Sequence, residues 1–134
     1  MNEEVRTLIK YRLAQADESI EEARILRKEN MSLRGVVNRL YYAMFYATLA
    51  LLQAQSLGTS KHAGVVSLFD KEFVKRGIFD KTMSQALHRG FELRQKADYM
   101  EKPTISKEDV DELLNSAVSF VDRVKQHCQE KQLA

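Results

Sequence analysis

Apolar residues recur along this chain at gaps of three and four, which is the spacing of one face of an α-helix. The first such stretch covers residues 3–28, and Asn2 stands where an N-cap residue would accept hydrogen bonds from the first turn. The second stretch covers residues 33–56, and its run from Leu40 to Ala47 is apolar or aromatic on nearly all faces. A helix of that kind has to be surrounded by its neighbours. We therefore predict two helices, the second of which lies in the core.

Turn and cap residues divide the rest of the chain into further helices. Gly58 ends the second helix, because glycine tolerates the left-handed conformation of a helix cap. Thr59 or Ser60 begins a third helix, which stops at Gly77, and Asp80 begins a fourth. The connections between these helices are short, which is typical of helices that pack side by side.

The fourth helix reaches Asp98 and Tyr99, and Pro103 forbids its continuation. Ser106-Lys107-Glu108-Asp109 resembles a capping box, with aspartate in place of the usual glutamate or glutamine, and opens a fifth helix. The sequence shows no strand pattern and no internal repeat. We predict an all-α protein: a compact antiparallel bundle of four to five helices, forming one domain over residues 1–134.

Composition and charge limit the class of function. The chain has 134 residues, of which 44% are apolar and 30% charged, as in a soluble globular domain. Its formal net charge of +2 is low for a dedicated duplex-DNA binder, although it leaves room for phosphate contact at a local site. The sole cysteine, Cys128, cannot form an internal disulfide, which fits a reducing cytoplasm.

Membrane insertion is not expected. The longest apolar run, from Leu40 to Leu52, is shorter than the roughly 20 residues that a membrane-spanning helix needs. The acidic start, Met1-Asn2-Glu3-Glu4, lacks the charged-then-apolar layout of a signal peptide. We expect a cytoplasmic protein without membrane contact.

The first candidate site lies near the end of the fourth predicted helix. Arg94 and Asp98 stand at i and i+4 on one helix face, and Tyr99 is next to them. In the ordinary interpretation this is a surface ion pair, which spacing alone favours. In the functional interpretation the forked guanidinium and the phenol bind a phosphate group, and Lys96 adds positive charge nearby.

The second candidate site is the start of the third predicted helix, with Lys61 and His62. A helix N-terminus attracts anions, and an imidazole there could donate to a phosphate or transfer protons. The alternative is a polar first turn without a function. On the second helix, Tyr41, Tyr42 and Tyr46 could form a stacking surface for bases, but core packing or a dimer face explains them better.

No pattern for a metal or a cofactor is present. His127 is followed by Cys128, but no further histidine or cysteine stands near them, which makes a poor metal site. The sequence also lacks a glycine-rich phosphate loop, a nucleophile elbow and a pair of catalytic carboxylates. We expect neither a metal nor a cofactor, and we expect His88 to be structural.

Four segments in a fixed order resemble the HEPN domain, named for higher eukaryotes and prokaryotes nucleotide-binding. They are Tyr41–Phe45, Ser60–Val65, Phe73–Gly77 and Arg94–Tyr99, within a likeness over about residues 5–125. The chain is similar to the small stand-alone bacterial and archaeal members. This resemblance implies an up-and-down bundle, usually a homodimer, whose gene is often paired with that of a minimal nucleotidyltransferase. Many such pairs are toxin–antitoxin systems in which the HEPN protein is a metal-independent endoribonuclease.

The resemblance also implies a catalytic arginine that is followed, after four to six residues, by a histidine. Arg94 matches the arginine, but no arginine of this chain has a histidine at that spacing, and Tyr99 stands in its place. A phenol with an ordinary pKa near 10 is a poor general base at neutral pH. His62 matches a histidine of this subgroup and could supply an imidazole only if the fold brings it near Arg94. Some family toxins are silenced by transfer of AMP to a tyrosine, but Glu101 stands at that position here.

Three functions are compatible with these residues. The favoured one is a nucleotide- or RNA-phosphate-binding partner of a separate nucleotidyltransferase, with binding residues Arg94, Lys96, Asp98, Tyr99, Lys61 and His62. The second is a divergent endoribonuclease, for which Arg94 and His62 are the catalytic candidates. The third is a helical dimerisation module whose polar residues only join helices.

Overall fold

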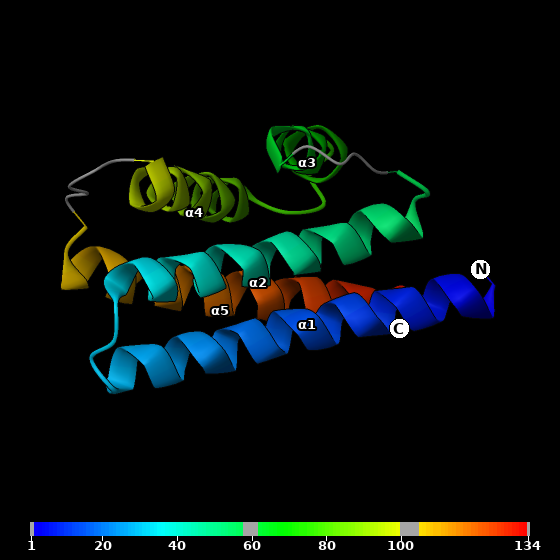
Figure 1. Ribbon diagram of the computed structural model, residues 1–134. Helices are drawn as coiled ribbons and strands as arrows, with labels where there is room; N and C mark the ends of the chain where they lie inside the picture. Colours follow the sequence, from blue (N-terminus) through cyan, green and yellow to red (C-terminus); the bar gives the residue numbers. More distant parts are fainter. Residues whose placement is uncertain (1, 58–61, 100–104, 134) are drawn as a thin grey trace.

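A computed structural model describes residues 2–57, 62–99 and 105–133 of the protein. Every regular element in these ranges is a helix, which confirms the all-α prediction (Figure 1). The elements are α1 (Glu3–Lys28), α2 (Leu33–Ala54), α3 (His62–Phe69), the π-helical turn η1 (Asp70–Val74), α4 (Lys81–Tyr99) and α5 (Lys107–Glu130).

Two predicted helix caps are present. At the start of α1, the side-chain oxygen of Asn2 accepts a hydrogen bond from the backbone N–H of Val5 at 2.8 Å. At the start of α5, the hydroxyl of Ser106 accepts from the N–H of Asp109 at 3.0 Å, and the Asp109 carboxylate accepts from the N–H of Ser106 at 3.2 Å. This reciprocal pair satisfies two of the N–H groups that a helix N-terminus leaves without partners.

The third predicted helix differs from the structure in its second half. The α-helical part ends at Phe69, and the chain widens into η1 before it turns. Gly77 has a φ of 75°, a left-handed conformation that glycine adopts without strain, so the predicted stop at this residue is confirmed. The predicted boundaries at residues 58–60 and at Pro103 lie outside the described residues.

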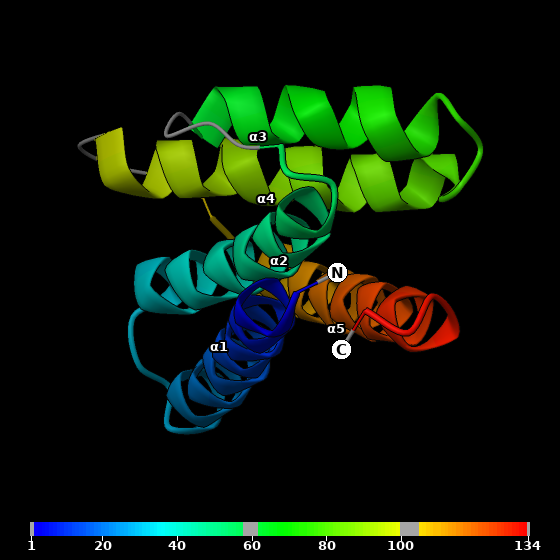
Figure 2. The ribbon, with the colours of Figure 1, turned by 90° about the vertical axis from the view of Figure 1, so that its right-hand side faces the viewer.

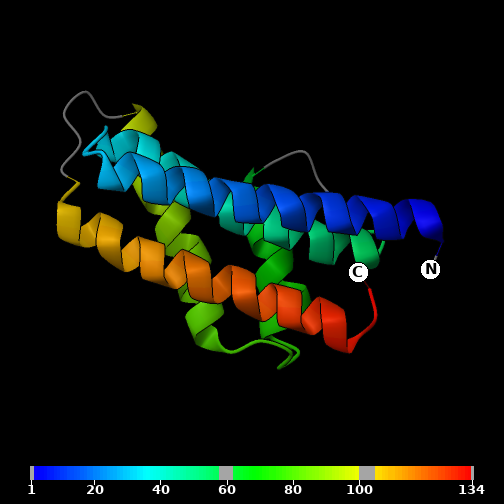
Figure 3. The ribbon, with the colours of Figure 1, turned by 90° about the horizontal axis from the view of Figure 1, so that it is seen from below.

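The helices form two crossing layers. In Figure 1, α1, α2 and α5 lie lengthwise, with α1 and α2 antiparallel, whereas α3 and α4 are seen nearly end on. After a quarter turn, Figure 2 shows α3 and α4 lengthwise and side by side above α2. Seen from below, α1 and α5 cover the other side of the molecule (Figure 3). The bundle is thus confirmed, and the α3–α4 pair lies across its other helices.

Helix α2 occupies the centre, as its apolar pattern predicts. Its buried residues are Val36, Val37, Leu40, Tyr41, Ala43, Met44, Phe45, Ala47, Thr48, Ala50, Leu51 and Leu52. The buried hydroxyl of Thr48 donates to the backbone carbonyl of Met44 at 2.8 Å, which offsets the cost of removing it from water. The crossing layers therefore meet on α2.

Gly90 lies where α4 packs tightly against α2. A Cβ atom at this position would lie 2.6 Å from Cε of Met44 and 3.5 Å from a ring carbon of Tyr41. The missing side chain lets the backbone of α4 approach the ring of Tyr41, one helical turn before Arg94. The packing of the two layers thus sets the position of Arg94.

A cluster of four phenylalanine rings joins the α3–η1 segment to α5. The ring of Phe69 lies 5.2 Å from that of Phe120 and 5.8 Å from those of Phe73 and Phe79, measured between centroids. All four side chains are buried. Offset aromatic contacts at these distances stabilise beyond simple burial, so this cluster anchors the short α3 helix.

Candidate functional site

Helices α2, α3 and α4 meet around the buried ring of Tyr41, which is 0% exposed. From α4, the guanidinium carbon of Arg94 lies 5.7 Å from the centroid of this ring and 5.6 Å from that of Tyr42. Both distances are within the range of a cation–π contact. Arg94 therefore rests on two neighbouring tyrosines of α2, and its orientation is set by them.

A carboxylate stands between two arginines at this site. Oδ2 of Asp98 lies 3.1 Å from Nε of Arg94, and its Oδ1 lies 4.0 Å from Nε of Arg34. The Arg94 contact is within ion-pair distance, yet this Nε atom is buried without a well-aligned hydrogen bond among the described residues. We regard the contact as an attraction between charges with poor hydrogen-bond alignment, because the N–H does not point at the carboxylate.

His62, the first residue of α3, approaches Tyr41 from another side. Its Nδ1 atom lies 2.9 Å from the hydroxyl of Tyr41, and its ring stacks on Phe45 with centroids 4.3 Å apart. The fold thus brings Arg94 and His62 to the same tyrosine, which is the condition for His62 to act with Arg94.

Burial keeps both partners of this hydrogen bond neutral. It raises the pKa of the Tyr41 phenol well above its usual value, an effect that the charge of Arg94 partly opposes. Burial, together with the charge of Arg94, lowers the pKa of His62 below its usual value. At neutral pH the site therefore contains a phenol, a neutral imidazole and a fixed cation.

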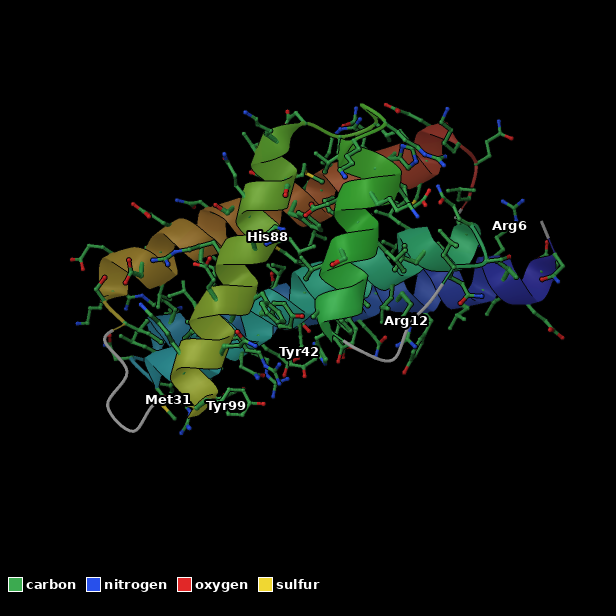
Figure 4. The ribbon with its side chains drawn as sticks, turned by 90° about the horizontal axis from the view of Figure 1, so that it is seen from above. Arg6, Arg12, Met31, Tyr42, His88 and Tyr99 are labelled. Carbon is green, nitrogen blue, oxygen red and sulfur yellow. The ribbon has the colours of Figure 1, made fainter. Side chains whose placement is uncertain are left out.

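The other predicted binding residues lie apart from this cluster or outside the described residues. Tyr99 is 75% exposed and projects from the end of α4 (Figure 4). Lys96 is exposed and lies near the start of α5, where hydrogen bonds with Ser106 lower the pKa of Asp109 and the charge of Lys96 adds to this effect. Lys61 belongs to the part of the chain that the structure does not describe.

Residues 9–127, from α1 to α5, match the family model of the HEPN domain. This chain belongs to the HEPN family. It is 39% identical over 125 residues to a "UPF0332 protein" of Thermotoga maritima, with 93% of each chain covered. It is also 36% identical over 131 residues to "Putative toxin MJ0605" of Methanocaldococcus jannaschii, covering 97% of this chain and 96% of that one. "Putative toxin MJ0142" of the same organism is 34% identical over 97 residues, 72% of this chain and 66% of that one.

Two residues of this candidate site are absent from the binding and catalytic residues predicted from the sequence. The ring of Tyr41 contacts Arg94 and its hydroxyl contacts His62, although its apolar sequence surroundings favoured a role in packing. Arg34 faces Asp98 from the start of α2. The position of Arg34 could have been inferred from the sequence. It precedes Tyr41 by seven residues and so lies on the same helix face, two turns away.

The remaining histidines of this HEPN domain have other surroundings. Nε2 of His88 lies 2.6 Å from Oδ2 of Asp70, whose Oδ1 accepts a hydrogen bond from the hydroxyl of Ser84 at 2.7 Å. This contact ties α4 to η1. His127 is buried with its ring 5.2 Å from that of Phe79, and burial is the main reason why its pKa is lowered.

The described part of the HEPN domain contains no group of three or more histidine, cysteine, aspartate or glutamate side chains that could hold a metal ion. The thiol of Cys128 is buried, and burial raises its pKa to about 11, so it is a poor nucleophile. None of the described helices combines the length and the apolar character needed to cross a membrane.

Proposed function

We propose that this HEPN protein binds the phosphate of a nucleotide or RNA at the cluster of Arg94, Tyr41 and His62. The observation that carries the proposal is the convergence of Arg94 and His62 on one buried tyrosine. A guanidinium held on aromatic rings is pre-oriented, so it loses little freedom when it binds a phosphate oxygen. Arg34, which is half exposed, adds a second cation on the other side of Asp98.

The aromatic surface beside Arg94 supports a ligand that carries a base as well as a phosphate. Tyr42 and Tyr46 are only half buried, and their ring centroids lie 5.7 Å apart. Figure 4 shows Tyr42 between α4 and the start of α3. Aromatic faces next to cations are used to stack unpaired bases, which favours nucleotides and single-stranded RNA over duplexes.

We also propose that the protein acts as a homodimer, in the cytoplasm, as the partner of a separate nucleotidyltransferase. Membership of the HEPN family supports the dimer, because the small stand-alone members that this chain resembles are usually homodimers. Two relatives are named as toxins, which supports a toxin–antitoxin-type module of this kind.

Phosphate binding can be tested on the wild-type protein by NMR. We expect a short single-stranded RNA, and separately ATP, to shift the ring signals of His62 and Tyr42. The signals of His127 should stay in place, because this ring is enclosed in the phenylalanine cluster. Absence of any shift, or shifts confined to His88 and His127, would rule out binding at this site.

A divergent endoribonuclease is the second candidate, and the link from Arg94 through Tyr41 to His62 favours it. In metal-independent cleavage the 2′-hydroxyl loses its proton to a base and attacks the adjacent phosphorus. The P–O5′ bond breaks, the 5′-oxygen takes a proton from water, and a 2′,3′-cyclic phosphate remains. The neutral imidazole of His62 would accept that proton, and Arg94 would stabilise the added negative charge on phosphate.

Cleavage is expected to be lost in His62→Ala and kept in His88→Ala, assayed on RNA in the presence of a chelator. Because the pKa of His62 is lowered, its base form persists as the pH falls below 6.5, and the rate should fall only at still lower pH. Undiminished cleavage by His62→Ala would point to another site or to a contaminating nuclease.

A further inference from the structure

Tyr41 contacts both functional groups of the proposed site, Arg94 and His62. Its ring face carries Arg94 and its hydroxyl reaches Nδ1 of His62. The side chain is 0% exposed, so it cannot itself be reached by a large ligand. A buried phenol needs a hydrogen-bond partner, and the ring nitrogen of His62 is that partner.

We propose that Tyr41 is a positioning residue, which holds neutral His62 in the tautomer that has its proton on Nε2 and thereby makes the ring a hydrogen-bond donor to phosphate. This inference rests on the proposed phosphate-binding function. It assigns to His62 the role of a donor that acts together with Arg94, and it assigns to Tyr41 no contact with the ligand.

The direction of the hydrogen bond follows from the chemistry of the two groups. A phenol is a good donor and a weak acceptor, whereas the unprotonated nitrogen of an imidazole is a good acceptor. Burial keeps the proton on Tyr41, and the cation on its ring face makes that proton more acidic. The strongest pairing is therefore Tyr41 O–H donating to Nδ1 of His62, which leaves the ring proton on Nε2.

The surroundings of His62 contain nothing described that would select the opposite tautomer. The titratable and charged groups that face it are Tyr41 and Tyr42 from α2 and Arg94 from α4. Within the described residues, no carboxylate contacts either ring nitrogen. Stacking on Phe45 fixes the ring plane, so the hydroxyl of Tyr41 determines which nitrogen is protonated.

The test compares Tyr41→Phe with Tyr42→Phe. Both variants keep a ring under Arg94 and lose one hydroxyl, but only Tyr41→Phe removes the partner of Nδ1. The ¹⁵N chemical shifts of His62 report the tautomer directly, without any ligand. We expect one tautomer, protonated on Nε2, in the wild type and in Tyr42→Phe, and a mixture of both in Tyr41→Phe.

Affinity for a short single-stranded RNA is the second measurement. We expect Tyr41→Phe to bind about fivefold more weakly than the wild type, because the donor is no longer held in place. A wild-type protein protonated on Nδ1 would overturn the inference, even if Tyr41→Phe failed to fold, and would instead favour His62 as a base. An unchanged tautomer in folded Tyr41→Phe would overturn it too.

Phosphate binding at this site and the positioning role of Tyr41 can be disproved independently. If the tautomer behaves as expected and no variant binds RNA or ATP, the phosphate-binding function is wrong and the role of Tyr41 in orienting His62 stands. If RNA binds and Tyr41→Phe changes neither the tautomer nor the affinity, the function stands and the positioning role is wrong.

Discussion

The Arg94→Ala variant is expected to bind a short single-stranded RNA, or ATP, about 10- to 100-fold more weakly than the wild type. A hydrogen bond from a charged group contributes about 1.5–3 kcal/mol, and Arg94 is the half-buried cation held on two tyrosine rings. Fluorescence anisotropy at one fixed salt concentration measures the change in affinity.

The same variant separates the binding function from a purely structural one. If Arg94 served only to hold Asp98, its removal would leave a lone carboxylate and cost about 3–5 kcal/mol were that group buried. Here Asp98 also faces Arg34, and its side chain is 27% exposed. We therefore expect a loss of only about 1–2 kcal/mol in the free energy of unfolding, from the ion pair and the cation–π contacts together.

Lys96→Ala is the matched control for Arg94→Ala. It removes one positive charge from the same helix, at a position that faces the start of α5 and not Tyr41. We expect its affinity for RNA to stay within about twofold of the wild type, because a distant exposed charge is screened by salt. Equal weakening by both variants would show that binding depends on overall charge and not on this site.

Phe69→Ala is expected to lower the free energy of unfolding by about 3–5 kcal/mol, the usual cost of removing a buried phenyl ring. The ring is 0% exposed and contacts three other phenylalanines, including Phe120 of α5. Because α3 spans only His62–Phe69, loss of this anchor should also loosen His62 at its other end. Urea unfolding followed by circular dichroism measures the loss of stability.

Two control variants show whether the loss of stability in Phe69→Ala comes from the buried ring. Phe69→Leu keeps an apolar side chain in the cluster and should cost well under the full amount, about 1–2 kcal/mol. Ile25→Ala removes a side chain that is 58% exposed and should change stability by less than about 0.5 kcal/mol. A loss below about 1 kcal/mol in Phe69→Ala would mean that this ring does not anchor α3.

The helices could be predicted because their signals are local. Asn2 caps α1, and the pair Ser106 and Asp109 caps α5, through contacts within four residues of chain. The turn η1 could not be predicted in this way. The spacing of Phe69 and Phe73 fits an ordinary α-helix, whereas in the structure the turn is wider and both rings pack against Phe79.

In the candidate site, too, the local contact could be predicted from the sequence and the contact between helices could not. Arg94 and Asp98 could be paired from sequence because i and i+4 share a helix face, and the structure shows them 3.1 Å apart. The part played by Tyr41 could not be found, because its position in an apolar run is equally consistent with plain packing.

The sequence by itself determined an all-α chain, the faces of its helices and the pairing of Arg94 with Asp98, since each depends on residues within a few turns of one another. Only the tertiary structure decided that Arg94 and His62 contact the same tyrosine. They come from α4 and α3, and they share Tyr41 because that pair of helices crosses α2 where Gly90 allows close approach. Such a contact depends on how whole layers pack, and no local pattern records it.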